Sequence, residues 1–246
     1  MRQRMRHKIG VLGIVAAVCL ILGLRVSAAQ AAEPGLLGWW KFDEGKGFVI
    51  RDSSGKGNDG EIDGAVWTQG RKGPALKFDS LSQGCVVLKT DLALYPTSAF
   101  TIEAWFKPLP NPEREAYILA FDYQWAQTTG KGIALYMHGE PEHNTLQLEV
   151  SNSAGRRAVV VARGLKTGNW YYCAATYDGS TITLYLDGVP AANTLLAAPV
   201  VYAHKKSGDF SIGDSVGNFN FSGLIDELRI YNRALGPEEI KLHNSR

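Results

Sequence analysis

The sequence predicts an all-β fold of two packed sheets or a barrel, and three observations support this prediction. From Pro34 onward, short runs alternate apolar and polar residues. The runs end at glycine, aspartate, asparagine or proline, which are typical of turns. Until the last residues of the chain, none of them has the spacing of a helical face. Many short strands at this spacing are typical of β-sandwiches and barrels.

Five runs carry the alternation most clearly. Because successive side chains of a strand point to opposite faces, every second apolar residue is expected to face the core. The runs and their expected core residues are 101–108 with Ile102, Ala104 and Phe106; 132–139 with Ile133, Leu135 and Met137; 145–152 with Leu146, Leu148 and Val150; 157–164 with Val159 and Val161; and 181–188 with Ile182, Leu184 and Leu186.

Two local signals refine this pattern. Asp178 and Gly179 separate two alternating runs and predict a hairpin, since glycine supplies a positive φ. Near the end of the chain, Pro237 stands where a first helical turn tolerates proline, and two acidic residues follow it. Ile240 and His243 then share one helical face. The sequence therefore predicts a short C-terminal helix.

Residues 1–31 have the layout of a secretory signal peptide. A basic, acid-free start precedes an apolar run from Ile9 to Leu24, and Ala29–Ala31 offers an A-x-A cleavage site. An uncleaved membrane anchor is the alternative, because the 16-residue run approaches the roughly 20 that a spanning helix needs. The small residues after the run favour cleavage. We therefore expect a secreted, periplasmic or cell-surface protein with one domain, residues 34–246, and no remaining membrane span.

Removal of this segment changes the charge balance. It takes away five basic residues and no acid, so 21 basic residues remain against 24 acidic ones, a net charge of −3. No cluster of lysine and arginine with interleaved aromatic residues remains. This composition argues against a nucleic-acid partner.

Two cysteines remain, Cys85 and Cys173, and an oxidising compartment would permit them to pair. Buried free thiols are the alternative. A disulfide requires the two Cα atoms to lie within roughly 7 Å, and the sequence does not determine that distance.

Four stretches together resemble the LamG-like jelly-roll family of the concanavalin A-like lectin/glucanase superfamily, which includes laminin G modules and pentraxins. In order they are LLGWWKFDEGKGFVIRDSSGKGNDGEI, SAFTIEAWFKP, NWYYCAATYDGSTITLYLDGVP and FSGLIDELRIYNRALGPEEI. The resemblance implies a two-sheet antiparallel jelly roll whose first and last strands are neighbours. It also implies a structural calcium site, as in many members, and a role in binding glycans or proteins.

The cysteines depart from that family's pattern. In pentraxin-like members the cysteine equivalent to Cys173 pairs with one in the strand matching 101–108, which has no cysteine here. Cys85 is the partner that remains, so the family's disulfide is not carried over unchanged.

A glycine-rich acidic loop at 51–63 contains Asp52 and Asn58, and Asp43 precedes it. Calcium takes six to eight oxygen ligands from carboxylates, amides and carbonyls, and such a loop is able to wrap one. A solvated turn explains the same composition without a metal.

Asp226 favours the metal. It lies on the parity of Leu228 and Ile230, so a regular strand would point its carboxylate toward the core, where it needs a partner. In the competing account, Asp226 accepts backbone N–H groups or pairs with Arg51. We hypothesise one structural Ca²⁺ held by Asp43, Asp52, Asn58 and Asp226.

Aromatic residues suggest a ligand site. Phe121, Tyr123 and Trp125 alternate before a polar loop, and Tyr136 and His138 take the polar face of their strand. Aromatic faces stack on sugar rings, although packing of a large sandwich is the alternative for each residue. The predicted ligand-binding residues are Tyr123, Trp125, Tyr136 and His138.

Catalysis is less well supported by the sequence. The superfamily includes glycoside hydrolases and polysaccharide lyases, and retaining glycosidases need two carboxyl groups about 5–5.5 Å apart, as two residues on one strand face supply. Asp226 and Glu227 are adjacent, and Glu103 stands alone in its run. We expect a non-catalytic binding module, calcium-stabilised and specific for carbohydrate. The alternatives are an enzyme of those two kinds and a module that adheres to cell-surface or extracellular proteins.

Overall fold

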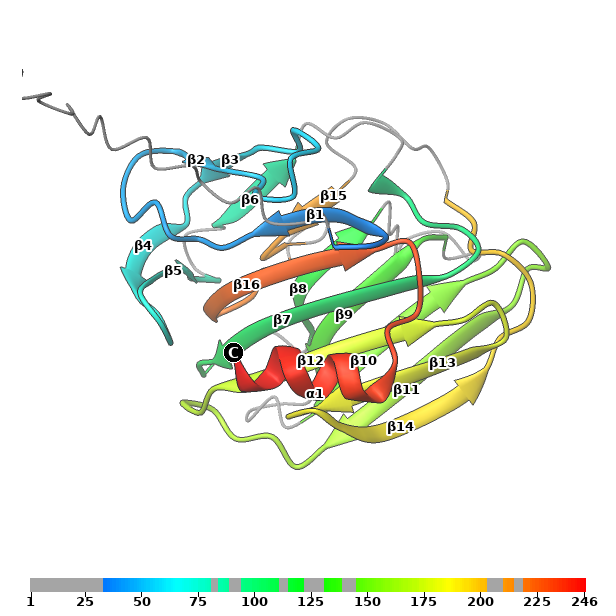
Figure 1. Cartoon of the computed structure of the whole chain (residues 1–246). Helices are drawn as coiled ribbons and strands as arrows, with labels where there is room; N and C mark the ends of the chain where they lie inside the picture. Colours follow the sequence, from blue (N-terminus) through cyan, green and yellow to red (C-terminus); the bar gives the residue numbers. More distant parts are fainter. Residues whose placement is uncertain are drawn as a thin grey trace, which may run out of the picture. The chain divides into compact units, whose positions relative to one another are not determined.

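Two antiparallel β-sheets pack face to face, and one short helix lies against the outer side of the first sheet (Figure 1). The computed structural model describes residues 33–80, 84–88, 94–110, 115–121, 131–138, 145–202, 210–214 and 219–246. Within it, Glu33–Arg246 forms one compact unit. The all-β two-sheet prediction is confirmed. The predicted signal peptide lies outside the described residues.

Sheet A has the strand order β14-β13-β12-β7-β16-β5-β4, and β1 pairs with β16 beside it. Because β1 and β16 pair antiparallel, the first and last strands are neighbours, as the family resemblance implies. The strands are β1 (Leu36–Trp40), β4 (Val66–Gln69), β5 (Pro74–Phe78), β7 (Phe100–Pro108), β12 (Tyr171–Tyr177), β13 (Thr181–Leu186), β14 (Val189–Leu195) and β16 (Gly223–Tyr231).

Sheet B has the order β11-β10-β9-β8-β15-β6-β3-β2 and forms the second layer. Figure 1 shows β8 to β11 behind the strands of sheet A. Its strands are β2 (Val49–Ile50), β3 (Gly60–Asp63), β6 (Cys85–Leu88), β8 (Glu115–Phe121), β9 (Ile133–His138), β10 (Thr145–Ser151), β11 (Arg157–Arg163) and β15 (Phe210–Ile212).

The predicted core faces are confirmed for four of the five runs, now β7, β9, β10 and β13, whose expected residues pack in or against the core between the sheets. The prediction for β11 is wrong. Its core residues are Ala158, Val160 and Ala162, whereas Val159 is 39% exposed. The register explains this, because Val160 pairs with Leu148 and directly opposite residues share a face.

The predicted hairpin and helix are both present. β12 and β13 pair across the Asp178–Gly179 turn, where Gly179 has φ +98° and Asp178 Oδ1 accepts the N–H groups of Ser180 and Thr181. The helix α1 (Pro237–Ser245) buries Ile240 and His243. Its first turn is fixed because the Glu239 carboxylate accepts the Gly236 N–H and pairs with Arg233.

A β-bulge in β16 changes the orientation of Asp226. The register with β7 shifts between Asp226 and Arg229, and Glu227 has φ +54°. Ile225 and Leu228 face the core, but Asp226 lines the outer side of sheet A beside His243 of α1. The prediction that Asp226 points into the core with Leu228 is therefore wrong, because the bulge breaks the strict alternation on which it rested.

Candidate functional site

A pocket of about 470 Å³ opens on the face of sheet B that is turned away from the core. Strand alternation builds it: Leu135 and Met137 of β9 enter the core, so Tyr136 and His138 point outward. Its lining residues in the described part of the chain are Glu115, Tyr136, His138, Gln147, Glu149, Arg157, Val159 and Phe219.

Aromatic rings form the floor of this pocket. Tyr136 stacks on Tyr117 with ring centroids 5.0 Å apart and an interplanar angle of 19°, and Phe219 lies 5.8 Å from Tyr117. The Tyr136 hydroxyl donates to Gln147 Oε1 at 3.1 Å. Tyr136 is therefore held in place both by stacking and by a hydrogen bond.

Two buried glutamates flank this floor. Glu115 accepts a hydrogen bond from the Tyr117 hydroxyl at 3.1 Å, and Glu149 pairs with Arg157 at 3.1 Å. Burial, followed by the negative charges of Glu149 and Glu115, raises the pKa of Tyr136, while Arg157 opposes the shift. Two carboxylates and one guanidinium therefore lie close enough to the Tyr136 hydroxyl to affect its ionisation.

The two glutamates come from different strands. Glu115 aligns with His138 of β9, and His138 aligns with Thr145 of β10, four residues before Glu149. Their Cα atoms are thus about 10 Å apart across the sheet and about 13 Å along it. The two glutamates therefore differ from a retaining glycosidase pair supplied by two residues on one face of a single strand.

The structure brings together two of the four predicted ligand-binding residues, Tyr136 and His138. Tyr123 and Trp125 lie outside the described residues. The sequence analysis missed Gln147 and Glu149, although both alternate with core leucines of β10 and could have been found from that pattern. Phe219 belongs to no alternating run, and no sequence signal identified it.

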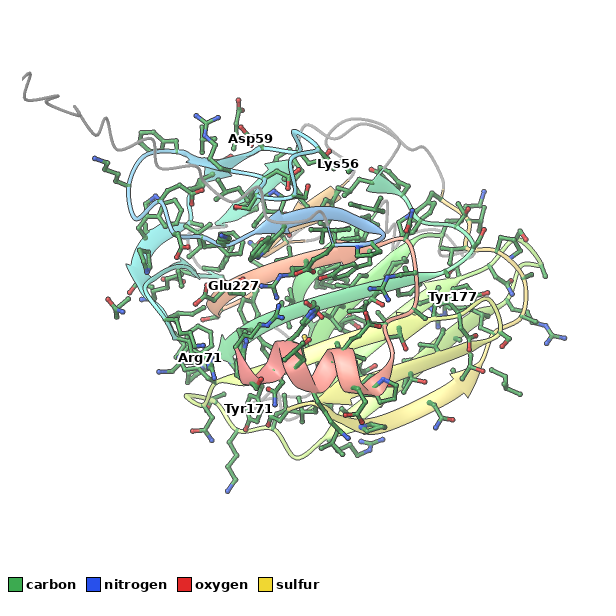
Figure 2. The ribbon with its side chains drawn as sticks, viewed as in Figure 1. Lys56, Asp59, Arg71, Tyr171, Tyr177 and Glu227 are labelled. Carbon is green, nitrogen blue, oxygen red and sulfur yellow. The ribbon has the colours of Figure 1, made fainter. Side chains whose placement is uncertain are left out.

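The predicted calcium ligands fall into two places. Asp52 accepts three backbone N–H bonds, from Trp39 at 3.0 Å, Ser54 at 2.8 Å and Asn58 at 3.0 Å. The Asn58 amide donates to the Leu37 carbonyl at 3.0 Å. Asp52 and Asn58 thus fasten the loop between β2 and β3 to β1, and Figure 2 shows Lys56 and Asp59 on this loop.

Asp43 and Asp226 flank the turn between β4 and β5. Arg71 N donates to Asp226 Oδ2 at 3.3 Å, and a Cβ placed on Gly73 would lie 3.5 Å from Asp43 Oδ1. The pKa of Asp226 is raised to about 7. Burial is the largest cause, the hydrogen bond from the Arg71 N–H opposes it, and the negative charges of Glu227 and Asp43 add to it. Figure 2 labels Arg71 and Glu227 here. The N–H groups of Arg71 and Glu227 offset part of this burial, and arginine and lysine side chains line the same pocket as Asp226.

The four predicted ligands do not form one cluster. Across the described ranges, no group of three or more histidine, cysteine, aspartate or glutamate side chains is arranged to hold a metal. The residues therefore fit a metal in part, through Asp43 and Asp226, while Asp52 has its oxygens occupied by N–H donors.

Cys85 and Cys173 are both free thiols, in sheet B and sheet A respectively. The disulfide left open by the sequence is not formed. Burial raises the pKa of Cys85 to about 11 and that of Cys173 to about 12, so both remain protonated at neutral pH.

A second polar cluster lies beneath α1 on the outer side of sheet A. Glu103 is fully buried, and its carboxylate meets His243 Nδ1 at 2.8 Å, Arg229 Nη1 at 3.1 Å and the Tyr172 hydroxyl at 2.7 Å. Burial raises the pKa of Glu103, but the hydrogen bond and charge of His243, followed by Arg229, lower it further than burial raises it. This network ties the helix to the sheet.

The chain thus combines a two-sheet antiparallel sandwich with a pocket on one outer face. The model for the concanavalin A-like lectin/glucanases superfamily matches residues 82–241, so the chain belongs to this family. No helix in the described ranges is long and apolar enough to cross a membrane.

Individual relatives are distant. Domain 4 of AbnA, an extracellular arabinanase from Geobacillus stearothermophilus solved with arabinotriose, has a TM-score of 0.65 and 21% identity, over 87% of this chain and all of that one. The binding domain of botulinum neurotoxin DC, solved with SialylT, has a TM-score of 0.65 and 12% identity, over 86% and 51%. Pappalysin-1 of the mouse (Mus musculus) is 24% identical over 62% of this chain. The matched region is 10% of the length of pappalysin-1.

Proposed function

We propose that this protein is an exported, non-catalytic carbohydrate-binding module whose glycan site is the pocket on the outer face of sheet B. The observation that carries the proposal is an aromatic floor, Tyr136 with Phe219, set among carboxylate and amide groups. A sugar has an apolar C–H face and a rim of hydroxyls, and this arrangement matches both. The sugar ligands present in two structural neighbours support it.

Export and domain limits belong to the same proposal. Residues 1–31 act as a cleaved signal peptide and residues 34–246 form the mature module, in the periplasm, at the cell surface or outside the cell. Tyr123 and Trp125, outside the described residues, are proposed as further ligand-binding residues. Glu115 and Glu149 lie on different strands, unlike the same-strand pair of a retaining glycosidase, which supports a non-catalytic role.

A glycan array, followed by calorimetry on the hits, tests the proposal. We expect Tyr136→Ala to weaken binding by roughly two- to tenfold, since an aromatic contact contributes about 0.5–1.5 kcal/mol. Phe48→Ala is the control, because Phe48 is 79% exposed and does not line the pocket. Trp125→Ala should also weaken binding. An absence of any glycan hit would favour protein adhesion, and release of shortened oligosaccharides would favour an enzyme.

Calcium is proposed as a structural ion held through the carboxylates of Asp43 and Asp226. When bound, it would neutralise the buried Asp226 carboxylate and fasten the turn between β4 and β5 to β16. Asp52 and Asn58, the other two predicted ligands, would support the site by ordering the neighbouring loop.

Thermal unfolding with and without EDTA tests this ion. At 100 times its dissociation constant, calcium should add about 2.7 kcal/mol and raise the Tm by roughly 5–10 °C. Asp226→Asn should abolish the rise, whereas Asp59→Asn, in the loop between β2 and β3, should retain it. An EDTA-insensitive Tm in the calcium-loaded wild type would contradict the proposal.

A further inference from the structure

The charges of the pocket are unequal. Glu115 and Glu149 contribute two carboxylates, while Arg157 is the one arginine or lysine among the described lining residues. Its guanidinium is paired with Glu149. Among the described lining residues, carboxylates therefore outnumber the guanidinium two to one.

The polar groups that line the pocket are mainly hydrogen-bond acceptors. Ionised carboxylates only accept hydrogen bonds, with about four lone-pair sites each. The Tyr117 hydroxyl donates to Glu115, and Arg157 pairs with Glu149. The Gln147 carbonyl is a further acceptor, already receiving the Tyr136 hydroxyl. A ligand that supplies donors suits this lining.

A negative group on the ligand would meet strong opposition here. Glu115 is 7% exposed and Glu149 is 2% exposed, so water screens their charges poorly. Like charges brought together in such a site are penalised by several kcal/mol. Hydroxyl or ammonium groups would instead form charge-assisted hydrogen bonds, and an ammonium group would also be attracted to the aromatic floor.

We infer that the pocket selects neutral sugars and protonated amino sugars, and rejects glycans whose contacting residue is a uronic acid, a sialic acid or a sulfated sugar. The inference rests on the proposed glycan-binding function and adds the charge class of its ligand. It separates this pocket from any site for sialylated glycans, although the sandwich resembles the toxin domain solved with SialylT.

The test compares oligosaccharides that share one backbone and differ only in charge. For the backbone that binds best on the array, the neutral, amino and uronate forms are titrated by calorimetry, at a pH where the amine is protonated. The neutral or amino form should bind at least about tenfold more tightly than the uronate.

Charge-removing variants assign the selectivity to this pocket. Glu115→Gln and Glu149→Gln should each reduce the tenfold discrimination to about threefold or less, chiefly by strengthening uronate binding. Glu238→Gln on α1 is the control and should leave it unchanged, because that side chain is 86% exposed and lies outside the pocket.

Two outcomes would overturn the inference while leaving the proposed function intact. In the first, an acidic glycan binds most tightly and Tyr136→Ala abolishes that binding. In the second, neither glutamine variant alters the discrimination between the neutral and the uronate form. Because Glu115 and Glu149 are replaced separately, misfolding of one variant leaves the other informative. Failure of every glycan to bind would instead refute the proposed function, and the inference with it.

Discussion

The outer faces of the two sheets both contain buried glutamates hydrogen-bonded to tyrosines, but in different surroundings. Each buries glutamate beside tyrosine: Glu103 with Tyr172 on sheet A, and Glu115 with Tyr117 on sheet B. On sheet A, α1 closes over the acid and supplies His243, and Glu103 receives contacts from three side chains. On sheet B the glutamates line a pocket of about 470 Å³.

This difference separates stability from function. A buried carboxylate with a full set of partners holds elements together, and removing Glu103 would leave Arg229 with Glu227 alone as an acidic partner. A carboxylate beside an open volume keeps acceptor sites for a ligand. Substitutions on sheet A should therefore act on folding, and those on sheet B on binding.

The largest effect is expected from Glu103→Ala. It leaves the guanidinium of Arg229, which is 7% exposed, and the ring of His243 without their shared acid. Breaking a buried ion pair in this way costs about 3–5 kcal/mol, which urea unfolding measures directly. Glu238→Ala, which removes an exposed pair with Lys241, should change stability by less than about 1 kcal/mol. Equal midpoints for the two variants would contradict the comparison.

The next effect concerns the helix that closes sheet A. Ile240 is fully buried against the outer-face cluster, so Ile240→Ala should cost about 2–5 kcal/mol. Leu242, two residues further along α1, is 50% exposed, and Leu242→Ala should change stability by less than about 0.5 kcal/mol. If both variants unfold at the wild-type denaturant concentration, α1 does not seal this face.

The pH dependence of stability should also come from sheet A. The pKa of Glu103 is lowered in the folded state, so its ionised form stabilises the protein above the ordinary glutamate pKa, and this contribution is lost as pH falls below that value. The stability difference between wild type and Glu103→Gln should therefore be largest near neutral pH and shrink toward pH values below about 4. Denaturation curves across this range measure it, and a difference independent of pH would exclude the mechanism.

The sequence was sufficient for the fold because alternation and turn residues report directly on strands. It placed the hairpin at Asp178 and the helix at Pro237 correctly. It failed at β11, where both faces carry apolar residues and the face of Val159 and Val161 was wrongly assigned to the core. It also failed at Asp226, where a bulge shifts the parity. The alternation of apolar and polar residues does not determine which residues of two strands pair, or where a strand contains a bulge.

The site was only partly predictable for a related reason. Tyr136 and His138 were found because each is an outward residue on a clear strand. Glu115 comes from β8 and Phe219 from outside any strand, and they meet Tyr136 only through the order of strands in sheet B. Such convergence depends on long-range pairing, which a single sequence does not specify.

The smallest effect, and the finest test of the comparison, is expected from Tyr136→Phe. The variant keeps the ring on Tyr117 but removes the hydroxyl that donates to Gln147, so stability should change by about 1 kcal/mol or less. The freed Gln147 carbonyl can then accept a ligand hydroxyl, and glycan affinity should change by a few-fold at most. The matched change on sheet A, Tyr172→Phe, removes a donor from the buried Glu103 and should destabilise by about 1.5–3 kcal/mol. Equal losses of stability in the two variants would show that both faces are structural, and the distinction between a sealed face and a binding face would fail.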